Sequence, residues 1–253
     1  ALETLTSTEV KLLRDKTTAD VYKAQIEDMV TRNVARKLSK EELDNWKGPK
    51  FYISHLAVNN PKSKSTPVRI VFNSSQEYHG ISLNDALYKG PDAYLNNLVG
   101  LLLRWREDRI AVVGDIKKMF NSVVLEEVEQ QCHRFLWRDL ETMRKPDIYV
   151  MTRVNMGDRP AGTISTEAVY KTAELFKSDS PKAADMLKNG SYVDDLLDSV
   201  STMEEAKSLS SEAESMLRKG GFIIKFWTFS GQKVEEDDGM AKVLGIGWRP
   251  LED

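Results

Sequence analysis

Two adjacent carboxylates, Asp194 and Asp195, interrupt the apolar stretch Tyr192-Val193-Asp194-Asp195-Leu196-Leu197. Apolar runs on both sides of a short polar step predict a hairpin whose tip carries the two aspartates. A third aspartate, Asp115, closes another apolar run, Ile110-Ala111-Val112-Val113-Gly114. The chain therefore presents three carboxylates at the ends of predicted strands.

Carboxylate oxygens are ligands that magnesium prefers, and histidine or cysteine would replace them poorly. Together, Asp115, Asp194 and Asp195 indicate nucleotidyl transfer with two magnesium ions, which clamp a triphosphate, activate a 3′ hydroxyl and stabilise the leaving pyrophosphate. A second interpretation stays open at this point. Asp194-Asp195 is also ordinary turn chemistry, because short polar side chains bond to nearby backbone, and Asp115 also suits a cap for the following segment.

The 253-residue chain is 41% hydrophobic, enough to bury a full core as one large domain or two subdomains. No apolar stretch approaches the roughly 20 residues that cross a bilayer, and the start lacks a signal-peptide pattern. We expect a soluble fragment of a longer protein. Cys132 is the single cysteine, so we expect an intracellular protein without disulfides or a cysteine-based zinc site, with Cys132 packed as a small apolar residue.

The formal net charge of −3 does not by itself indicate a partner that carries phosphate. The distribution is more informative, because the segment 47–69 contains five Lys or Arg residues and no Asp or Glu. A lobe that meets phosphate is often locally basic while the whole molecule is mildly acidic. Charge alone leaves a solvated lysine-rich loop equally open.

The pattern of apolar residues predicts helices in the charged segment 1–46, where Val10, Leu13, Val21, Ile26 and Met29 are spaced to pack on a core. Further helices are predicted at 94–106, 125–131, 162–177 and 203–219, the last ending at Gly220-Gly221. Strands are predicted at 51–58, 68–72, 110–115, 134–137, 148–154, 222–227 and 243–248, besides the hairpin at Tyr192. Antiparallel strands with helices on one face give an α+β fold.

Several sequence motifs follow one another across residues 50 to 250. They are Val68-Arg69-Ile70-Val71-Phe72, Gly80-Ile81-Ser82-Leu83-Asn84-Asp85-Ala86-Leu87 with Gly90-Pro91, Asp115-Ile116-Lys117-Lys118-Met119-Phe120, Arg134-Phe135-Leu136-Trp137-Arg138, Met151-Thr152-Arg153-Val154 through Gly157, Tyr192-Val193-Asp194-Asp195, Gly220-Gly221-Phe222 with Lys225, and Leu244-Gly245 with Trp248. Their order resembles the fingers and palm of a reverse transcriptase, of the type carried by BEL/Pao long-terminal-repeat retrotransposons.

The resemblance implies a right-hand polymerase fold with an antiparallel palm sheet. A helical extension over 1–46 would precede the fingers at 47–108 and 132–155, and the palm would comprise 109–131 and 156–253 with a primer-grip-like end. It also implies that Asp115 and Asp194 bind both catalytic metals, that Asp195 supports the site and that the backbone carbonyl of Ile116 adds a ligand. Magnesium is the expected ion, with manganese as a substitute.

The resemblance assigns further residues to nucleotide and primer. Phe120 matches the steric gate that excludes a ribose 2′ hydroxyl, although an aromatic residue in a hydrophobic core would give the same sequence pattern. Arg69 and Lys62 match residues that contact the triphosphate, and Gly157 matches the glycine over which template base and nucleotide stack. Lys225 matches a proton donor to pyrophosphate, or is a plain surface lysine. The primer grip would be Leu244, Gly245 and Trp248, whereas a core strand would look similar.

Two positions depart from the pattern of retroviral enzymes. Met156 stands where Gln often precedes the glycine, and Asn73 stands where related fingers often carry Asp. Neither departure affects the predicted metal ligands. We expect an RNA-directed DNA polymerase that acts on an RNA or DNA template with primer and deoxynucleoside triphosphates, in the cytoplasm or a capsid-like particle with access to the nucleus. The alternatives are a domesticated copy that only binds nucleic acid or assembles, and a palm polymerase that prefers ribonucleotides. The sequence does not indicate an oligomeric state.

Overall fold

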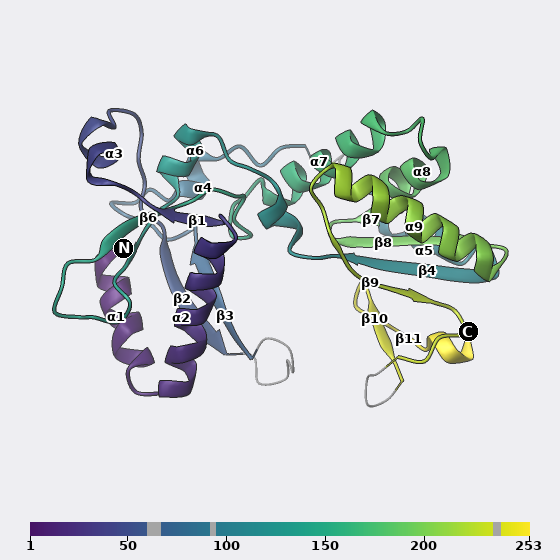
Figure 1. Ribbon diagram of the computed structural model, residues 1–253, viewed down its shortest axis with the longest axis horizontal. Helices are drawn as coiled ribbons and strands as arrows, with labels where there is room; N and C mark the ends of the chain where they lie inside the picture. Colours follow the sequence, from purple (N-terminus) through teal and green to yellow (C-terminus); the bar gives the residue numbers. More distant parts are fainter. Residues whose placement is uncertain (60–66, 92–94, 235–238) are drawn as a thin grey trace. The chain divides into compact units, whose positions relative to one another are not determined.

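The computed structural model describes residues 1–59, 67–91, 95–234 and 239–253 (Figure 1). The chain forms two compact units. Unit 1 comprises residues 1–89 and 124–161, and unit 2 comprises residues 90–123 and 162–253. Every pair of neighbouring strands in the described residues is antiparallel. The predicted α+β class with antiparallel sheets is therefore confirmed.

Unit 1 contains the predicted hairpin of β2 (Ser54–Asn59) and β3 (Val68–Asn73). The two strands pair from Ser54 opposite Asn73 to Asn59 opposite Val68. The expected basic tip of this hairpin, including Lys62, lies outside the described residues.

A second sheet in unit 1 has the strand order β1-β6-β5. Strands β5 (Arg134–Trp137) and β6 (Asp147–Met151) pair as the sequence predicts, although β6 ends earlier than expected. Strand β1 (Ala35–Lys37), which was not predicted from the sequence, pairs with β6. The segment before residue 47, predicted as a helical extension, thus contributes a strand as well as helices to unit 1.

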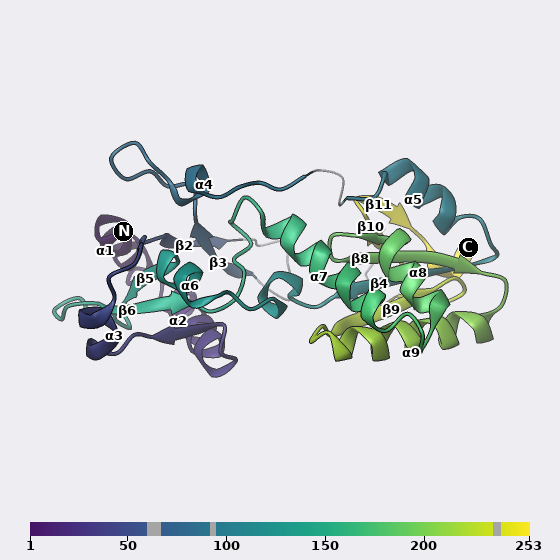
Figure 2. The ribbon, with the colours of Figure 1, turned by 90° about the horizontal axis from the view of Figure 1, so that it is seen from above.

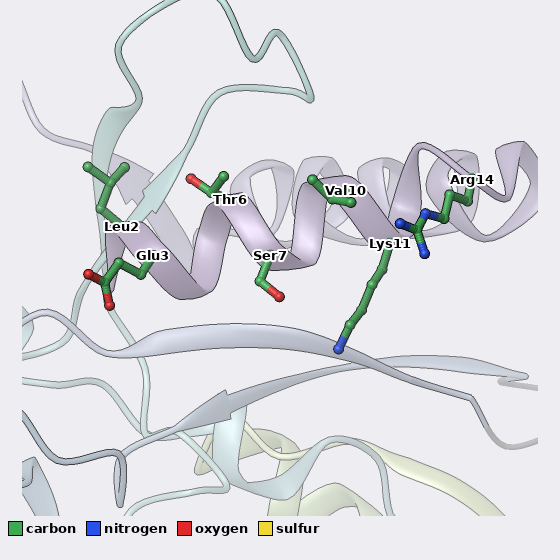
Figure 3. A pocket seen from close by; sticks show the side chains of 7 residues that line it. All are labelled: Leu2, Glu3, Thr6, Ser7, Val10, Lys11 and Arg14. Carbon is green, nitrogen blue, oxygen red and sulfur yellow. The ribbon is translucent and has the colours of Figure 1, made fainter.

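Helices α1 (Leu2–Leu12) and α2 (Lys16–Thr31) cover the core of unit 1. Their buried residues, among them Leu5, Leu12, Tyr22 and Ile26, pack with Phe72 and with aromatic residues of β5. The expectation that Val10 and Leu13 pack on the core is wrong, because their exposed fractions are 47% and 57%. The inward face of α1 instead carries Leu5, Thr8, Glu9 and Leu12. The outer face of α1 carries the residues that line a pocket of about 650 Å³. Figure 3 shows the side chains of these residues, which are Leu2, Glu3, Thr6, Ser7, Val10, Lys11 and Arg14.

Three short helices complete unit 1. They are α3 (Lys40–Asn45), α4 (Leu83–Ala86) and α6 (Glu127–Cys132). In α3 and α4 a serine N-cap and an acidic residue three positions later bond each other's backbone N–H groups, which fixes where each helix begins. Cys132 is half-buried against the core of unit 1, as predicted.

Unit 2 is built on a four-stranded sheet in the order β7-β8-β4-β9. Its strands are β4 (Ile110–Ile116), β7 (Ser191–Tyr192), β8 (Asp195–Val200) and β9 (Ile224–Phe229). Alternate residues of β4 face opposite sides: Val112 and Ile116 pack in one core cluster, whereas Ala111 and Val113 pack in another.

Helices α7 (Ala161–Leu175), α8 (Pro181–Asn189) and α9 (Met203–Lys219) cover the Val112 face of this sheet. The opposite face carries α5 (Leu98–Trp105) and the hairpin of β10 (Ala241–Val243) and β11 (Ile246–Trp248). Figure 2 shows α5 and α9 on opposite sides of β4 and β8. Most helices thus share one face, as predicted, and α5 adds a layer on the other. The described residues of unit 2 also include the 3₁₀ turns η2 (Met119–Ser122) and η3 (Pro250–Glu252).

Three details of unit 2 differ from the sequence prediction. The strand expected at 243–248 is a hairpin, because Leu244 and Gly245 both have positive φ, as a tight type I′ turn requires. Helix α8 was not predicted, although Ser180 caps it and Pro181 opens it. Helix α5 belongs to unit 2 and packs on β8, whereas the sequence placed 90–108 with the fingers. Among the described residues, no helix is long and apolar enough to cross a membrane.

Candidate active site

The end of the central β4/β8 pair places the backbones of the three predicted aspartates side by side. Asp115 of β4 lies directly opposite Asp195 of β8 in the antiparallel register. Directly opposed residues project their side chains from the same face of a sheet. The backbone N–H of Ile116 donates a hydrogen bond to the carbonyl of Asp194 at 2.7 Å. Backbone pairing alone therefore fixes Asp194 and Asp195 beside the end of β4.

The turn between β7 and β8 consists of only Val193 and Asp194, since Tyr192 pairs with Asp195. Val193 has φ of 54°, a left-handed conformation that is rare for a β-branched residue and costs about 1–3 kcal/mol. Strain of this kind persists only where the surrounding structure imposes it. Pairing of β8 with both β4 and β7 supplies that constraint here.

The three carboxylates crowd negative charge into a half-buried site. Burial raises the pKa of Asp115, Lys225 opposes the shift, and Asp194 adds to it. Burial, Asp194 and Asp115 together raise the pKa of Asp195 to about 6, against the effect of Lys225. A site with this excess of negative charge favours bound cations.

Lys225 is positioned by an irregularity in β9. Asp115 pairs with Phe226, whereas the next residue, Ile116, pairs with Ile224. Lys225 is therefore an extra residue opposite the step from Asp115 to Ile116, as in a β-bulge, which often re-aims a side chain beside an active site. Its ammonium lies 5.2 Å from the ring centroid of Phe226. The exposed Phe226, 45% accessible, is a neighbour of Asp115 that the sequence analysis did not single out.

The donor set has the chemistry of a magnesium site, but its side chains do not converge on one point. Within the described residues, no three Asp, Glu, His or Cys side chains lie close enough to hold a metal ion between them. Asp115 and Asp195 form an opposed pair, and the charge of Asp194 reaches both. The oxygen ligands thus fit a hard cation, and a bound ion would have to draw a third ligand inward.

Phe120 follows Asp115 by five residues and lies in η2. It is half-buried, whereas the preceding Met119 is 2% exposed and belongs to the core of unit 2. In the described part of the chain, Phe120 is not a member of any hydrophobic core cluster. This placement favours a ring available to a ligand over a ring that fills the core.

The predicted primer-grip residues form the hairpin on the same face of the sheet as Asp115. Leu244 and Gly245 make its turn. Trp248 is 6% exposed, and its ring lies edge-on to Trp105 of α5 with centroids 5.1 Å apart. Trp248 therefore anchors the hairpin to the sheet, and Leu244 packs beside it together with Tyr192.

The other predicted nucleotide contacts belong to unit 1. Arg69 is exposed on β3, and the side-chain amide of Gln25 bonds the carbonyl of Val68 and the N–H of Ile70 on either side of it. Gly157 is exposed in the turn that follows β6. A Cβ at Gly157 would lie 2.4 Å from the carbonyl oxygen of Phe72, so only glycine fits there. Lys62 lies outside the described residues.

No family model matches the chain. No curated protein matches it either.

Solved structures do resemble it. One is a foamy viral protease-reverse transcriptase in complex with an RNA/DNA hybrid, with a TM-score of 0.56, 17% identity, and coverage of 79% of this chain and 22% of that one. Another is a prototype foamy virus protease-reverse transcriptase mutant, with a TM-score of 0.59, 14% identity, and coverage of 83% and 24%. This chain thus spans about a quarter of the length of those proteins. At this identity the likeness concerns architecture, and the chain has a reverse transcriptase-like fold.

Proposed function

We propose that this chain is the fingers and palm of an RNA-directed DNA polymerase that adds deoxynucleotides to a primer 3′ end. The observation that carries the proposal is the register of β4 and β8, which opposes Asp115 and Asp195 while the two-residue turn holds Asp194 beside them. Binding of nucleic acid alone needs no cluster of carboxylates, since these repel phosphate.

Asp115 and Asp194 would hold magnesium, with Asp195 and the backbone carbonyl of Ile116 in support and manganese as a substitute ion. When bound, the metal supplies Lewis acidity toward the triphosphate and lowers the pKa of the attacking hydroxyl. The half-buried position of the aspartates limits solvent access and so strengthens their hold on a cation.

Other residues would contact the substrate. Phe120 would face the deoxyribose, and Lys225 would supply a proton to the leaving pyrophosphate. Arg69 would neutralise triphosphate oxygens, and Gly157 would offer bare backbone to a stacked base. The hairpin of Leu244 and Gly245, anchored by Trp248, would hold the primer end.

We further propose a template of RNA or DNA with its primer as the partner and a retrotransposon of the BEL/Pao type as the source. The fold likeness supports a nucleic-acid partner, because one foamy viral protein of that fold is in complex with an RNA/DNA hybrid and another with double-stranded DNA. The BEL/Pao type rests on the sequence motifs. A nucleic-acid cleft does not require a basic total charge, because five basic residues without an acidic one lie in segment 47–69.

The proposal is tested by primer extension on RNA and DNA templates with magnesium, comparing the wild-type chain with Asp194→Asn. This substitution removes a metal ligand and changes little volume. Extension should therefore be abolished while thermal unfolding and template binding stay nearly the same. Full extension by Asp194→Asn would refute the site, whereas template binding without extension by the wild type would favour a binding module.

A further inference from the structure

The side chain of Asn84 forms hydrogen bonds to the turn that contains Gly157, on both sides of Asp158. Its side-chain Nδ2 donates to the carbonyl of Gly157 at 3.0 Å, and its Oδ1 accepts from the backbone N–H of Arg159 at 2.8 Å. One planar amide therefore bonds the peptide groups that flank Asp158. The backbone of this turn cannot rotate there without breaking both hydrogen bonds.

Asn84 is itself held rigidly. It lies in α4, whose start is fixed by the reciprocal bonds of Ser82 and Asp85. Its backbone N–H donates to the carbonyl of Ser74 at 3.0 Å, and its Nδ2 also donates to Ser75 Oγ at 2.7 Å. The Ser82-Leu83-Asn84-Asp85 stretch thus links the end of β3 to the Gly157 turn.

Asp158 anchors the same turn from the buried side. Its Oδ1 accepts from Ser74 Oγ at 2.6 Å and from Asn155 Nδ2 at 3.2 Å. Its Oδ2 accepts from His133 Nε2 at 2.9 Å and from the backbone N–H of Asn155 at 3.2 Å. His133 Nδ1 faces the carbonyl of Glu129 at 2.6 Å, so both ring nitrogens point at acceptors.

A protonated imidazole satisfies both acceptors. Burial lowers the pKa of His133, but the hydrogen bond and charge of Asp158 outweigh it, with smaller support from Glu129, and raise that pKa above its ordinary value. Asp158 is buried as well, yet its bonds to His133, Ser74 and Asn155 keep its pKa low. Both ring nitrogens of His133 and both carboxylate oxygens of Asp158 therefore have hydrogen-bond partners in this buried anchor.

The outer surface of the turn is exposed. Met156 is 72% exposed, and the exposed Gly157 lies against the end of β3, where a Cβ would meet the carbonyl of Phe72. A fixed, exposed stretch of peptide suits close approach by a flat ring, because its backbone does not have to reorganise on binding.

We propose that Asn84 is a positioning residue for the base pair formed by template and incoming nucleotide, acting through the Gly157 turn with Asp158 as its second anchor. This inference rests on the proposed polymerase function. Within that function, the Ser82-Leu83-Asn84-Asp85 stretch would help to position the nucleotide, and neither Asn84 nor Asp158 would touch the substrate.

The test compares Asn84→Ala with the wild type in primer extension. Loss of both backbone bonds frees the turn, so the KM for deoxynucleotide should rise about fivefold to tenfold while kcat stays within about twofold. Gln130→Ala is the matched control. Its half-buried amide also donates to a backbone carbonyl in unit 1, that of Leu125 at 2.8 Å, away from the turn. It should leave KM unchanged.

A second measurement needs no activity. Hydrogen exchange of the Arg159 amide should accelerate at least about tenfold in Asn84→Ala and not in Gln130→Ala, because Asn84 is the acceptor of that N–H. Unchanged exchange, an unchanged KM, or an equal rise of KM in the control would each overturn the inference. If the wild type extends no primer, the polymerase proposal fails and the positioning role with it, whereas exchange still reveals whether Asn84 holds the turn.

Discussion

Asp115 lies directly opposite Asp195 across β4 and β8. Burial, the charge of Asp194 and the charge of Asp115 together raise the pKa of Asp195 to about 6. The metal-free protein therefore holds like charges together at the end of its central strand pair. Such an arrangement lowers the free energy of unfolding of the metal-free protein and raises its affinity for cations. Functional sites commonly reduce stability in this way.

Replacing one of these carboxylates should stabilise the metal-free protein. Asp195→Asn removes a repelling charge and little volume. After discounting for partial solvent exposure, we expect the free energy of unfolding at neutral pH to rise by about 1–2 kcal/mol. Denaturant unfolding in the presence of a chelator measures the change. Asp179→Asn is the control, because Asp179 pairs with Lys219 and its loss should bring no gain. Destabilisation by Asp195→Asn would contradict the crowding of charge.

The hairpin of β10 and β11 offers a test of backbone geometry. Gly245 has φ of 83°, so Gly245→Ala should lower the free energy of unfolding by about 1–2 kcal/mol, the cost of a left-handed alanine. Gly100 lies in α5, and a Cβ there meets only ordinary contacts. Gly100→Ala should therefore stabilise by about 0.5–1 kcal/mol. Denaturant titration of both variants measures whether the two changes in unfolding free energy have opposite signs. Changes of the same sign would argue against the left-handed conformation of Gly245 in the β10–β11 turn.

The sequence predicted the parts of the fold that local chemistry determines. The hairpin at Asp194 follows from apolar runs around two polar residues, and α9 ends at Gly220-Gly221, where Gly221 has φ of 82°. Strand β1 was missed because Ala35-Arg36-Lys37 is short and polar, and its pairing with β6 is a tertiary contact. Helix α8 did carry a local signal, the capping Ser180 before Pro181, that the periodicity did not reveal.

The candidate site shows the same difference between features that local sequence predicts and features that depend on tertiary contacts. The resemblance assigned a role to Phe120, and predicted strand ends singled out the three aspartates, although the catalytic roles of all four residues remain predictions. Contacts between distant residues were beyond reach. Asn84 meets Gly157 across 73 positions, and Lys225 owes its place to an irregular pairing of β9. The solvent-facing orientation of Val10 and Leu13 was not predicted, because an amphipathic pattern does not determine which of its apolar residues the core will cover.

Phe120 and Met119 form a matched pair that separates sugar selection from core packing. If the Phe120 ring lies beneath the incoming sugar, Phe120→Ala should admit ribonucleotides and narrow the ratio of kcat/KM for deoxy- over ribonucleotide by about tenfold or more. Because Phe120 is half-buried, its stability cost should stay below the 3–5 kcal/mol of a core aromatic. Met119→Ala should instead cost about 2–5 kcal/mol and leave discrimination unchanged.

Extension assays with both nucleotide classes, together with denaturant unfolding, decide the matter. If Phe120→Ala strongly destabilises the protein and leaves the discrimination between deoxy- and ribonucleotides unchanged, Phe120 is a core residue and not a sugar-selecting one.

The buried His55 in unit 1 should make the protein sensitive to acid. Its Nε2 faces the carbonyl of Leu136 at 2.8 Å, its Nδ1 faces the hydroxyl of Tyr22, and the rings of Phe72, Phe135 and Trp137 surround it. The neutral ring satisfies both partners, with Nε2 donating to Leu136 and Nδ1 accepting from Tyr22. Burial lowers the pKa of His55 to about 4, although the Leu136 carbonyl and the charge of Glu9 oppose the shift.

Between its ordinary pKa of about 6.5 and the folded value of about 4, the unfolded chain binds a proton at His55 that the folded chain excludes. Stability from this residue is therefore full above pH 6.5 and falls as the pH drops to 4, by about 3 kcal/mol in total. His55→Gln keeps a donor and an acceptor without titrating. Denaturant unfolding at pH 7, 5.5 and 4 should show that the difference in unfolding free energy between wild type and variant shrinks toward acid. A difference that stays constant would mean that His55 binds its proton equally in the folded and unfolded chains, so that burial does not lower its pKa.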